Sequence, residues 1–239
     1  MNELETNRQQ LESNGFSIID NVFTEEQIKI LSDKIDAADS SKATFRRTAN
    51  LFAIRQFLKE VPATIPLIFT DKLKNIIHHL FGKNYFVVKS IYFDKPPGSN
   101  WFVAYHQDLT ISVTAKANIE GYGPWTVKQD QYSVQPPLEI LHNAFTIRIH
   151  LDTTDENNGA LKVIDASHNA GICHVKDMEL IKDKEVLCKV GRGGIMIIKP
   201  LLLHASGRST NDNKRRVIHI EFNCCSLPGP LHWAELIDI

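Results

Sequence analysis

The sequence predicts an α+β chain, mainly β, with a core built as a β-sandwich or a β-barrel. Three observations lead to this prediction. Amphipathic helical patterns occupy much of the first 82 residues, short runs with strand alternation follow from residue 85 onward, and clusters of Gly, Pro, Asn and Asp separate those runs. Helices followed by many short strands with frequent turns are typical of this class. We expect a helical lead-in over residues 1–82 and a β core over about 83–225.

The lead-in contains two predicted helices and one short strand. Residues 24–27, Thr-Glu-Glu-Gln, have the form of a capping box, in which the Thr and Gln side chains each bond to the backbone N–H of the other residue. Residues 66–80 predict a second helix, which ends before Gly82, and residues 15–19 alternate as a strand does. Residues 42–64 show no regular pattern. The apolar stripe of the first helix has helical spacing: Ile28, Leu31, Ile35 and Ala38.

The β core is predicted from runs rich in β-branched and aromatic residues. In one of these runs, Thr146, Arg148 and His150 share one face, because successive strand residues point to opposite sides. Residues 110–143 interrupt the series and are rich in Gly, Pro, Gln and aromatic residues. A loop of that length is usually functional, so we expect a lid-like insertion. The predicted strands cover residues 85–93, 101–106, 145–151, 160–164, 195–198 and about 215–222.

Length and composition describe an ordinary globular protein. The chain has 239 residues, 43% of them hydrophobic, and a net charge of −1, which fits a single domain over residues 1–239. The balanced charge gives no reason to expect a nucleic acid or a membrane as partner. No run of about 18 apolar residues occurs. Four cysteines without a C-x-x-C pair favour reduced thiols, so we expect a cytoplasmic protein. The oligomeric state is not indicated.

A possible metal site is formed by residues from two distant segments. His106 and Asp108 make a His-x-Asp pair at the end of a predicted strand, and His204 follows an apolar run far downstream. Two histidines and one carboxylate are the ligands of the facial triad that binds iron(II) and leaves positions open for a cosubstrate and dioxygen. Arg215 lies eleven residues after His204, where a returning strand brings it near the same end of the core. A guanidinium there suits the distal carboxylate of a dicarboxylate cosubstrate.

The same sequence offers two rival pairs and a simpler alternative. His150 and Asp152 lead into a turn, where an Asp more often accepts backbone N–H bonds. His219 and Glu221 lie so near the carboxyl end that few strands remain to supply a distal ligand. Both pairs are therefore less favoured than the His106 pair. From the residues alone, buried structural histidines and a solvated pair of arginines remain the alternative to a metal site.

The order and spacing of these motifs resemble the phytanoyl-CoA dioxygenase family, a branch of the iron(II)/2-oxoglutarate oxygenases. The resemblance extends over about residues 85–222, and the segment that begins at Gly15 and Phe16 is also similar to the opening of the family. The stretches that carry it are Lys95-Pro96-Pro97-Gly98 leading into Tyr105-His106-Gln107-Asp108, then Arg148-Ile149-His150-Leu151-Asp152, then Asn157-Asn158-Gly159-Ala160-Leu161 with Ala166-Ser167-His168, and finally His204-Ala205-Ser206-Gly207 followed by Arg215-Arg216.

This resemblance implies a double-stranded β-helix, the cupin-like jelly roll, with the helices packed outside. It implies His106, Asp108 and His204 as ligands of Fe(II). It also implies that Arg215 pairs with the C5 carboxylate of 2-oxoglutarate and that Ser206 bonds nearby. The expected partners are dioxygen and a small-molecule substrate, and the expected reaction is hydroxylation of a C–H bond with release of succinate and CO₂. Related halogenases replace the carboxylate ligand by a small residue, so the presence of Asp108 favours hydroxylation over halogenation.

Two further residues are expected in the site. Arg148 stands where some members of the family carry a Trp near the cosubstrate, so it is expected to contact 2-oxoglutarate or an anionic substrate. Strand alternation places Ile91 on the same side as Lys89, and we expect both to face the cavity, Ile91 as part of the cosubstrate pocket. Two other functions remain open at this point: a catalytically silent or metal-binding jelly-roll sensor, and a zinc-dependent hydrolase on the same ligands.

Overall fold

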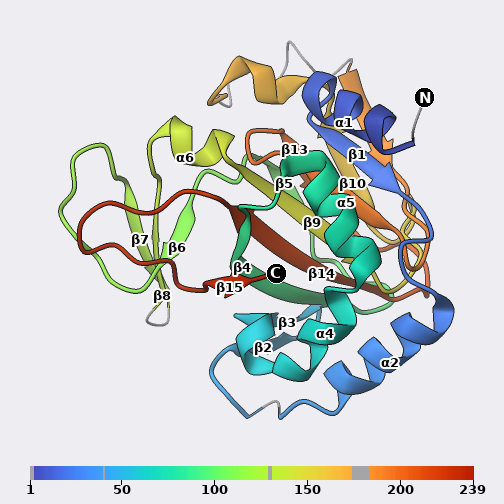
Figure 1. Ribbon diagram of the computed structural model, residues 1–239. Helices are drawn as coiled ribbons and strands as arrows, with labels where there is room; N and C mark the ends of the chain where they lie inside the picture. Colours follow the sequence, from blue (N-terminus) through green and yellow to red (C-terminus); the bar gives the residue numbers. More distant parts are fainter. Residues whose placement is uncertain (1–2, 40, 129–130, 174–183) are drawn as a thin grey trace.

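The computed structural model describes residues 3–39, 41–128, 131–173 and 184–239. Its centre is an eight-stranded sheet, which lies behind the helices in Figure 1. The paired strands described in this sheet are antiparallel. Their order is β1 (Phe16–Ile19), β12 (Ile195–Ile198), β9 (Ala144–His150), β14 (Arg215–Asn223), β4 (Phe86–Lys95), β3 (Leu51–Arg55) and β2 (Phe45–Thr48), with β15 (Ile237–Asp238) also paired to β4.

Two smaller antiparallel sheets complete the β structure. The four-stranded sheet has the order β11 (Glu185–Cys188), β10 (Leu161–Ile164), β13 (His204–Ser206) and β5 (Val103–His106). The three-stranded sheet has the order β6 (Ile111–Val113), β8 (Gln131–Val134) and β7 (Trp125–Lys128). Apolar residues of β12 pack against residues of β10 and β11 in one buried cluster, so the large and the four-stranded sheets face each other. This arrangement confirms the predicted mainly β sandwich.

The helices cover the outer face of the large sheet (Figure 1). They are α1 (Glu3–Ser13), α2 (Glu25–Asp36), α3 (Phe57–Glu60), α4 (Ile65–Ile68) and α5 (Asp71–Phe81), with the 3-10 turn η1 (Pro62–Thr64) between α3 and α4. Two other short elements, α6 (Leu138–His142) and η2 (Ser167–Ala170), occur later in the chain. The largest buried apolar cluster joins side chains of α2 and α5 to outward residues of the sheet, among them Phe145, Ile147, Ile149, Ile218 and Ile220.

The helix ends follow from the sequence. The Thr24 side chain accepts the Gln27 N–H at 3.2 Å, and the Thr24 N–H donates to Gln27 Oε1 at 2.9 Å, so the predicted capping box is confirmed. The single helix predicted over residues 66–80 is instead broken between α4 and α5. The break occurs because Thr70 is extended and caps α5 by accepting the Leu73 N–H.

The lead-in holds more β structure than its pattern indicated. Besides the expected β1, it supplies β2 and β3, which pair with each other and extend the large sheet through β4. Residues 42–64 were therefore wrongly expected to be irregular. β2 shows no apolar alternation because it is an edge strand of the sheet, and its Arg46, Arg47 and Thr48 are exposed. The expected long loop at residues 110–143 is likewise a folded unit, the three-stranded sheet followed by α6.

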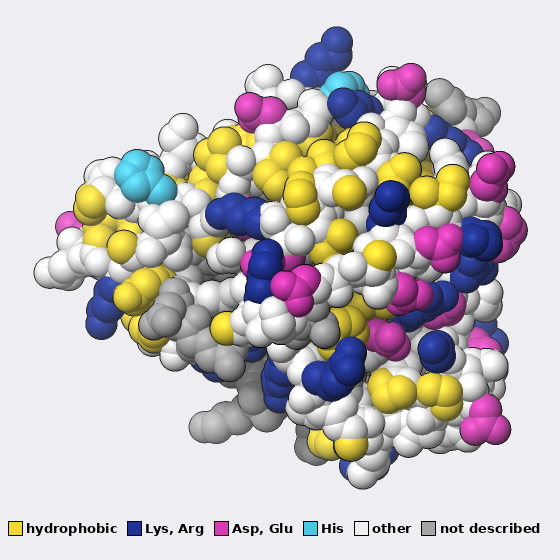
Figure 2. Space-filling view, turned by 90° about the horizontal axis from the view of Figure 1, so that it is seen from below, with side chains coloured by type: hydrophobic (Ala, Val, Ile, Leu, Met, Phe, Trp, Pro, Cys, Tyr) yellow, Lys and Arg dark blue, Asp and Glu magenta, His cyan; other side chains and the backbone are white. Residues whose placement is uncertain are grey.

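Strand alternation determines which residues enter the sandwich. Phe145, Ile147 and Ile149 of β9 join the helix-facing cluster, whereas Arg148, on the other face, lines a cavity between the sheets. The predicted alternation of this strand is confirmed. The surface seen in Figure 2 mixes acidic, basic and apolar side chains. In the described part of the chain, no helix combines the length and the hydropathy that crossing a membrane requires.

Candidate metal centre

Two neighbouring strands bring the candidate ligands together. His106 ends β5 and His204 begins β13, and the two residues are direct partners in the antiparallel ladder. Their ring centroids lie 4.2 Å apart. Asp108 follows β5 by two residues, and its backbone N–H donates to the Pro200 carbonyl at 2.9 Å. That bond ties the loop after β5 to the segment before β13, so residues 96 positions apart in the chain (108 to 204) meet at one point.

The ligand atoms are close enough to bind one ion. The distance from Asp108 Oδ1 to His106 Nε2 is 3.8 Å, and from Asp108 Oδ2 to His204 Nε2 it is 3.7 Å. Two donors that each lie about 2.1 Å from a divalent ion can be at most about 4.2 Å apart, and both distances satisfy this limit. One ligand atom from each of the three residues lies within 4.8 Å of the others.

Backbone carbonyls orient both imidazole rings for metal binding. His106 Nδ1 lies 2.9 Å from the Ala104 carbonyl oxygen, and His204 Nδ1 lies 2.9 Å from that of Leu202. A carbonyl oxygen only accepts, so each Nδ1 carries a hydrogen, and in the neutral ring Nε2 then has the lone pair for a ligand bond. The same tautomer therefore presents both rings to Asp108.

The electrostatics also favour a cation. Burial lowers the pKa of His204 to about 4, so its ring is neutral near pH 7. Burial alone raises the pKa of Asp108, but His204, His219 and Lys89 outweigh it and hold this pKa below its ordinary value. Asp108 Oδ2 is buried and accepts no hydrogen bond from the described residues. A charged oxygen without a donor, beside two imidazole rings, fits a divalent metal ion.

The remaining predicted site residues line the same cavity, which has a volume of about 190 Å³. Arg215 is 2% exposed and donates from Nη1 to the Gly159 carbonyl at 2.7 Å. Ser206 donates to the same carbonyl at 2.9 Å. Arg215 Nε is buried without a hydrogen-bond partner among the described residues. Arg148 and Ile91 also line this cavity, so the structure brings all seven predicted site residues together.

Arg215 and Arg216 have separate environments. Arg216 points to the other side of β14 and binds Asp152 through Nε at 2.9 Å and Nη2 at 2.8 Å. Asp152 also accepts the Arg216 backbone N–H at 2.9 Å. Arg215 faces the cavity, where burial, followed by the nearby Arg148, lowers its pKa to about 9. Only Arg215 of this pair is therefore placed to meet an anion in the cavity.

The rival pair His219 and Glu221, which we disfavoured as metal ligands, also lines this cavity. Their nearness to the carboxyl end of the chain does not remove them from the site, because β14 is a central strand of the sheet. Alternation along β14 from Arg215 puts residues 217, 219 and 221 on the inner face, and this signal was present in the sequence. The ligand atoms of Asp108, His219 and Glu221 also lie within 4.8 Å of one another.

His219 and Glu221 form a hydrogen-bonded chain with two cations. Lys89 Nζ lies 2.7 Å from Glu221 Oε1, which lies 3.0 Å from His219 Nε2. The other ring nitrogen of His219 lies 3.1 Å from Arg148 Nη1. Since a guanidinium only donates, His219 Nδ1 accepts and Nε2 donates to Glu221. The ring thus links Arg148 to the Lys89–Glu221 ion pair.

The other rival pair, His150 and Asp152, does not form a site. His150 is buried and its Nδ1 bonds to the Thr154 hydroxyl, whereas Asp152 accepts the bonds from Arg216. Asp152 thus accepts a backbone N–H, as predicted for an Asp at a turn. The two side chains have different partners, so they do not act together.

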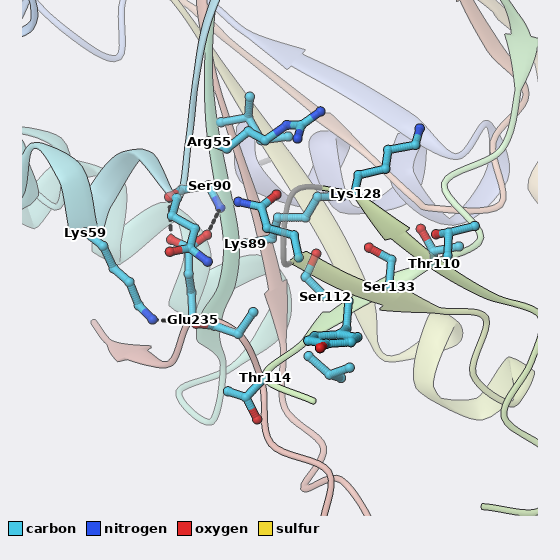
Figure 3. A pocket seen from close by; sticks show the side chains of 17 residues that line it. Arg55, Lys59, Lys89, Ser90, Thr110, Ser112, Thr114, Lys128, Ser133 and Glu235 are labelled. Atoms are coloured by element: carbon cyan, nitrogen blue, oxygen red, sulfur yellow. Dashed lines mark hydrogen bonds between the residues drawn. The ribbon is translucent and has the colours of Figure 1, made fainter. Parts of the chain in front are cut away.

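A larger cavity of about 450 Å³ adjoins the first (Figure 3). The two cavities share Lys89 and Ile91 of β4, which confirms that these two side chains face the interior. One wall of the outer cavity comes from β4 and the α3 region, with Lys59 and Glu235 nearby, and the other from the insertion, with Ser112 and Lys128. The insertion thus forms the far wall of a space that opens beside the candidate ligands.

Comparison with solved structures shows the same fold in other proteins. EctD from S. alaskensis superposes with a TM-score of 0.70 at 14% identity, over 90% of this chain and 75% of its own. AviO1 from Streptomyces viridochromogenes Tue57 gives 0.67 at 16% identity, over 96% and 98%. EvdMO1 gives 0.67 at 22% identity, over 92% of this chain but only 50% of its own length. These matches confirm the cupin-like jelly roll.

Sequence comparison gives the family. No curated protein sequence matches this chain significantly. The family model of phytanoyl-CoA dioxygenase (PhyH), however, matches residues 11–217, and this range contains the three candidate ligands and both inner cavity arginines. The match covers most of the chain and agrees with the likeness of fold, so the chain belongs to the phytanoyl-CoA dioxygenase family.

Proposed function

We propose that this protein is an iron(II)- and 2-oxoglutarate-dependent dioxygenase that hydroxylates a C–H bond of a small molecule. The observation that carries the proposal is the convergence of His106, Asp108, His204 and the buried Arg215 on one cavity. When bound, iron and 2-oxoglutarate together supply the oxidation of the substrate by dioxygen, with succinate and CO₂ as coproducts. Family membership supports dioxygenase-type chemistry in general.

The three ligands would hold Fe(II), and Arg215 with Ser206 would hold the cosubstrate. Arg215 and Ser206 both donate to the Gly159 carbonyl, so a carboxylate there would meet the guanidinium and would gain a bond from the hydroxyl if Ser206 turned away from Gly159. Solved structures of similar fold support iron and 2-oxoglutarate as the bound groups: EctD structures contain bound Fe, and 2-oxoglutarate with 5-hydroxyectoine. HygX from Streptomyces hygroscopicus contains nickel and 2-oxoglutarate.

Hydroxylation is the reaction that Asp108 favours. Its carboxylate is charged, buried and directed at both imidazoles, so it fills the position that a halide would need. Ile91 and Phe93 add apolar surface to the cavity, which limits water near the reacting centre. Relatives described as an epimerase, SnoN, and a carbocyclase, SnoK, show that the fold also serves other 2-oxoglutarate-dependent outcomes.

We further propose that residues 1–239 act as one oxygenase domain. Strands from residues 1–82 extend both edges of the sheet that carries Arg148 and Arg215, so the lead-in is part of the structure that positions the site. The insertion at about 110–143 would act as the substrate-facing wall, because its strands line the outer cavity. We expect that separating either part from the core abolishes cosubstrate binding.

Anaerobic titration with Fe(II) and 2-oxoglutarate tests the proposal. A metal-bound 2-oxoglutarate chelate has a visible charge-transfer absorption, which we expect in the wild-type protein and not in His204→Ala. His142→Ala is the matched control, since His142 lies exposed on α6. Absence of this absorption in the wild type contradicts the proposal. Succinate release that needs both iron and oxygen then separates an oxygenase from a zinc hydrolase or a catalytically silent sensor.

A further inference from the structure

We propose that the substrate is a small polyhydroxylated molecule that carries an anionic group, a carboxylate or a phosphate, and that the outer cavity binds it. The inference rests on the proposed function, because it assumes that the inner cavity holds the iron and the cosubstrate. Three observations lead to it: the charge around the two cavities, a free lysine at their outer wall and a row of unpaired hydroxyls on the insertion.

The described residues that line the two cavities include more cations than carboxylates. A bound Fe(II) and a doubly charged 2-oxoglutarate cancel each other, so they leave this excess unchanged. Charges in a partly enclosed, low-dielectric space interact strongly, and an excess of cations favours an anionic ligand. The cations are Arg55, Lys59, Lys89, Lys128, Arg148 and Arg215, and the carboxylates are Asp108, Glu221 and Glu235.

All three carboxylates already have a partner or a proposed role. Glu221 is bound by Lys89, and Asp108 is one of the proposed iron ligands. Glu235 is 2% exposed and accepts two hydrogen bonds from Ser90, one from its backbone N–H at 2.7 Å and one from its hydroxyl. The side chain of Lys128 is exposed and makes no hydrogen bond or ion pair with the described part of the chain. Its ammonium group is therefore available to a ligand.

The insertion turns a polar face toward the outer cavity. Ser112, Ser133 and Thr126 are direct partners across β6, β8 and β7 and form one row over the three strands. The neighbouring row, Ile111, Val134 and Trp125, packs on the other face into a buried apolar cluster. This polar face lines the outer cavity, where Ser112 and Ser133 are half-buried and Thr126 is exposed.

None of these three hydroxyls bonds to another group in the described part of the chain, although all three line the cavity. Thr110 and Thr114 add two more hydroxyl side chains to the same lining, as Figure 3 shows for most of this wall. Each hydroxyl can both donate and accept. A ligand with several hydroxyl groups can satisfy such a row, and a purely apolar ligand would leave it without partners.

The two cavities meet at Lys89 and Ile91. A ligand held by the hydroxyl row and the lysines of the outer cavity would therefore extend past these side chains toward His106 and Asp108. Cations of the outer cavity would hold the anionic group, the hydroxyl row would hold the hydroxyl groups, and the carbons nearest Lys89 and Ile91 would face the inner cavity. This placement assigns the recognition of charge to the insertion and the chemistry to the jelly roll.

Calorimetric titration of the anaerobic Fe(II)/2-oxoglutarate complex tests the inference. The probes are glucose 6-phosphate, glucuronate, glucose and glucosamine, which share a scaffold and differ in charge. We expect at least one of the two anions to bind about 10-fold tighter than glucose, with a loss of affinity as salt increases. The two anions distinguish a phosphate from a carboxylate as the charged group.

Variants locate the binding to the outer cavity. Lys128→Gln is expected to weaken the better anion about three- to ten-fold while binding of glucose stays the same. Ser133→Ala is expected to weaken both the anion and glucose. Lys83→Gln is the matched control, because Lys83 is exposed and does not line either cavity. The affinity of each variant for 2-oxoglutarate is measured alongside.

Several outcomes overturn the inference and leave the proposed function intact. They are equal or tighter binding of glucose or glucosamine, no binding of either anion at millimolar concentration, and an unchanged anion affinity in Lys128→Gln. In each case the charge-transfer absorption of the 2-oxoglutarate chelate would still form. Failure of that absorption in the wild type is a different result, which removes the proposed function and this inference together.

Discussion

Adjacent arginines on β14 provide the sharpest test of the proposed cosubstrate pocket. Arg215 is buried in the cavity and bonds to a neutral carbonyl, whereas Arg216 points to the opposite face and forms a bidentate ion pair with Asp152. We consider Arg215→Met and Arg216→Met. The two substitutions remove the same group from successive positions of one strand. A difference between the variants in stability or in 2-oxoglutarate affinity therefore comes from the surroundings of each arginine and not from the residue type.

The structure predicts effects of opposite kind. A fall of the Arg215 pKa from 12.5 to about 9 corresponds, at about 1.4 kcal/mol per pH unit, to a cost of roughly 5 kcal/mol for holding this charge. Arg215→Met relieves that cost but loses the bond to Gly159, worth about 1.5–3 kcal/mol. The metal-free variant should thus be as stable as the wild type or more stable. Its 2-oxoglutarate affinity should fall by about 3–5 kcal/mol, or at least 100-fold.

Arg216→Met should reverse this pattern. It leaves Asp152 without its bidentate partner, and we expect a loss of about 1–2 kcal/mol in unfolding free energy with unchanged cosubstrate affinity. Urea unfolding of the metal-free proteins measures the first quantity. Anaerobic titration of 2-oxoglutarate, followed by its charge-transfer absorption, measures the second. The reasoning is refuted if Arg215→Met is the less stable of the two variants and keeps wild-type affinity for 2-oxoglutarate.

Three other predictions address the metal, the pH dependence and the backbone. Asp108→Asn should weaken Fe(II) binding by more than about 100-fold, because loss of a direct ligand should cost more than loss of a residue that only supports a ligand. Equilibrium dialysis measures this affinity, and near-normal binding would exclude Asp108 as a ligand. Burial, followed by Arg215, lowers the pKa of Lys95 to about 7 from 10.5. Between these two values the unfolded chain keeps a proton that the folded chain has released, so raising the pH from 7 to 10 stabilises the folded chain. Urea unfolding of Lys95→Met should lack this rise, and an identical pH profile would contradict the assignment. Gly15 has a φ of +84°, and a Cβ there would lie 2.4 Å from His168 Nδ1, so Gly15→Ala should lose about 2–4 kcal/mol in unfolding free energy; a loss below about 1 kcal/mol would show that His168 moves aside.

Much of the site could be predicted because it depends on strand periodicity. The period of two along β9 and β14 separates Arg148 and Arg215 from their neighbours without any knowledge of the tertiary structure. The pairing of His106 with His204 could not come from periodicity, since it requires β5 and β13 to be adjacent. That adjacency was implied only by the resemblance to a family with a known order of motifs, which the match over residues 11–217 confirms.

What the sequence did not reveal has physical causes. The strand β2 has little apolar pattern because it is an edge strand with exposed side chains. The insertion has polar residues in its strands because their polar row faces a cavity rather than the core. The place of His219 and Glu221 in the cavity follows from alternation along β14, which we did not apply to this pair. An alternation of apolar and polar residues with the apolar face inward was expected in each strand. An edge strand is exposed, and a strand that lines a cavity carries polar residues on its inner face, so neither shows that pattern.

The partners of the buried cations explain why the inner cavity suits anionic ligands. Arg215 donates to the Gly159 carbonyl and Arg148 to the neutral ring of His219, and both arginines line this cavity. In the described part of the chain, neither of these two cations forms an ion pair with a carboxylate, so each is held by a neutral acceptor. An internal carboxylate would have to be displaced before a ligand could bind. Neutral acceptors fix the positions of the guanidinium groups without that competition. A carboxylate that enters the cavity therefore offsets the desolvation cost of the buried cations.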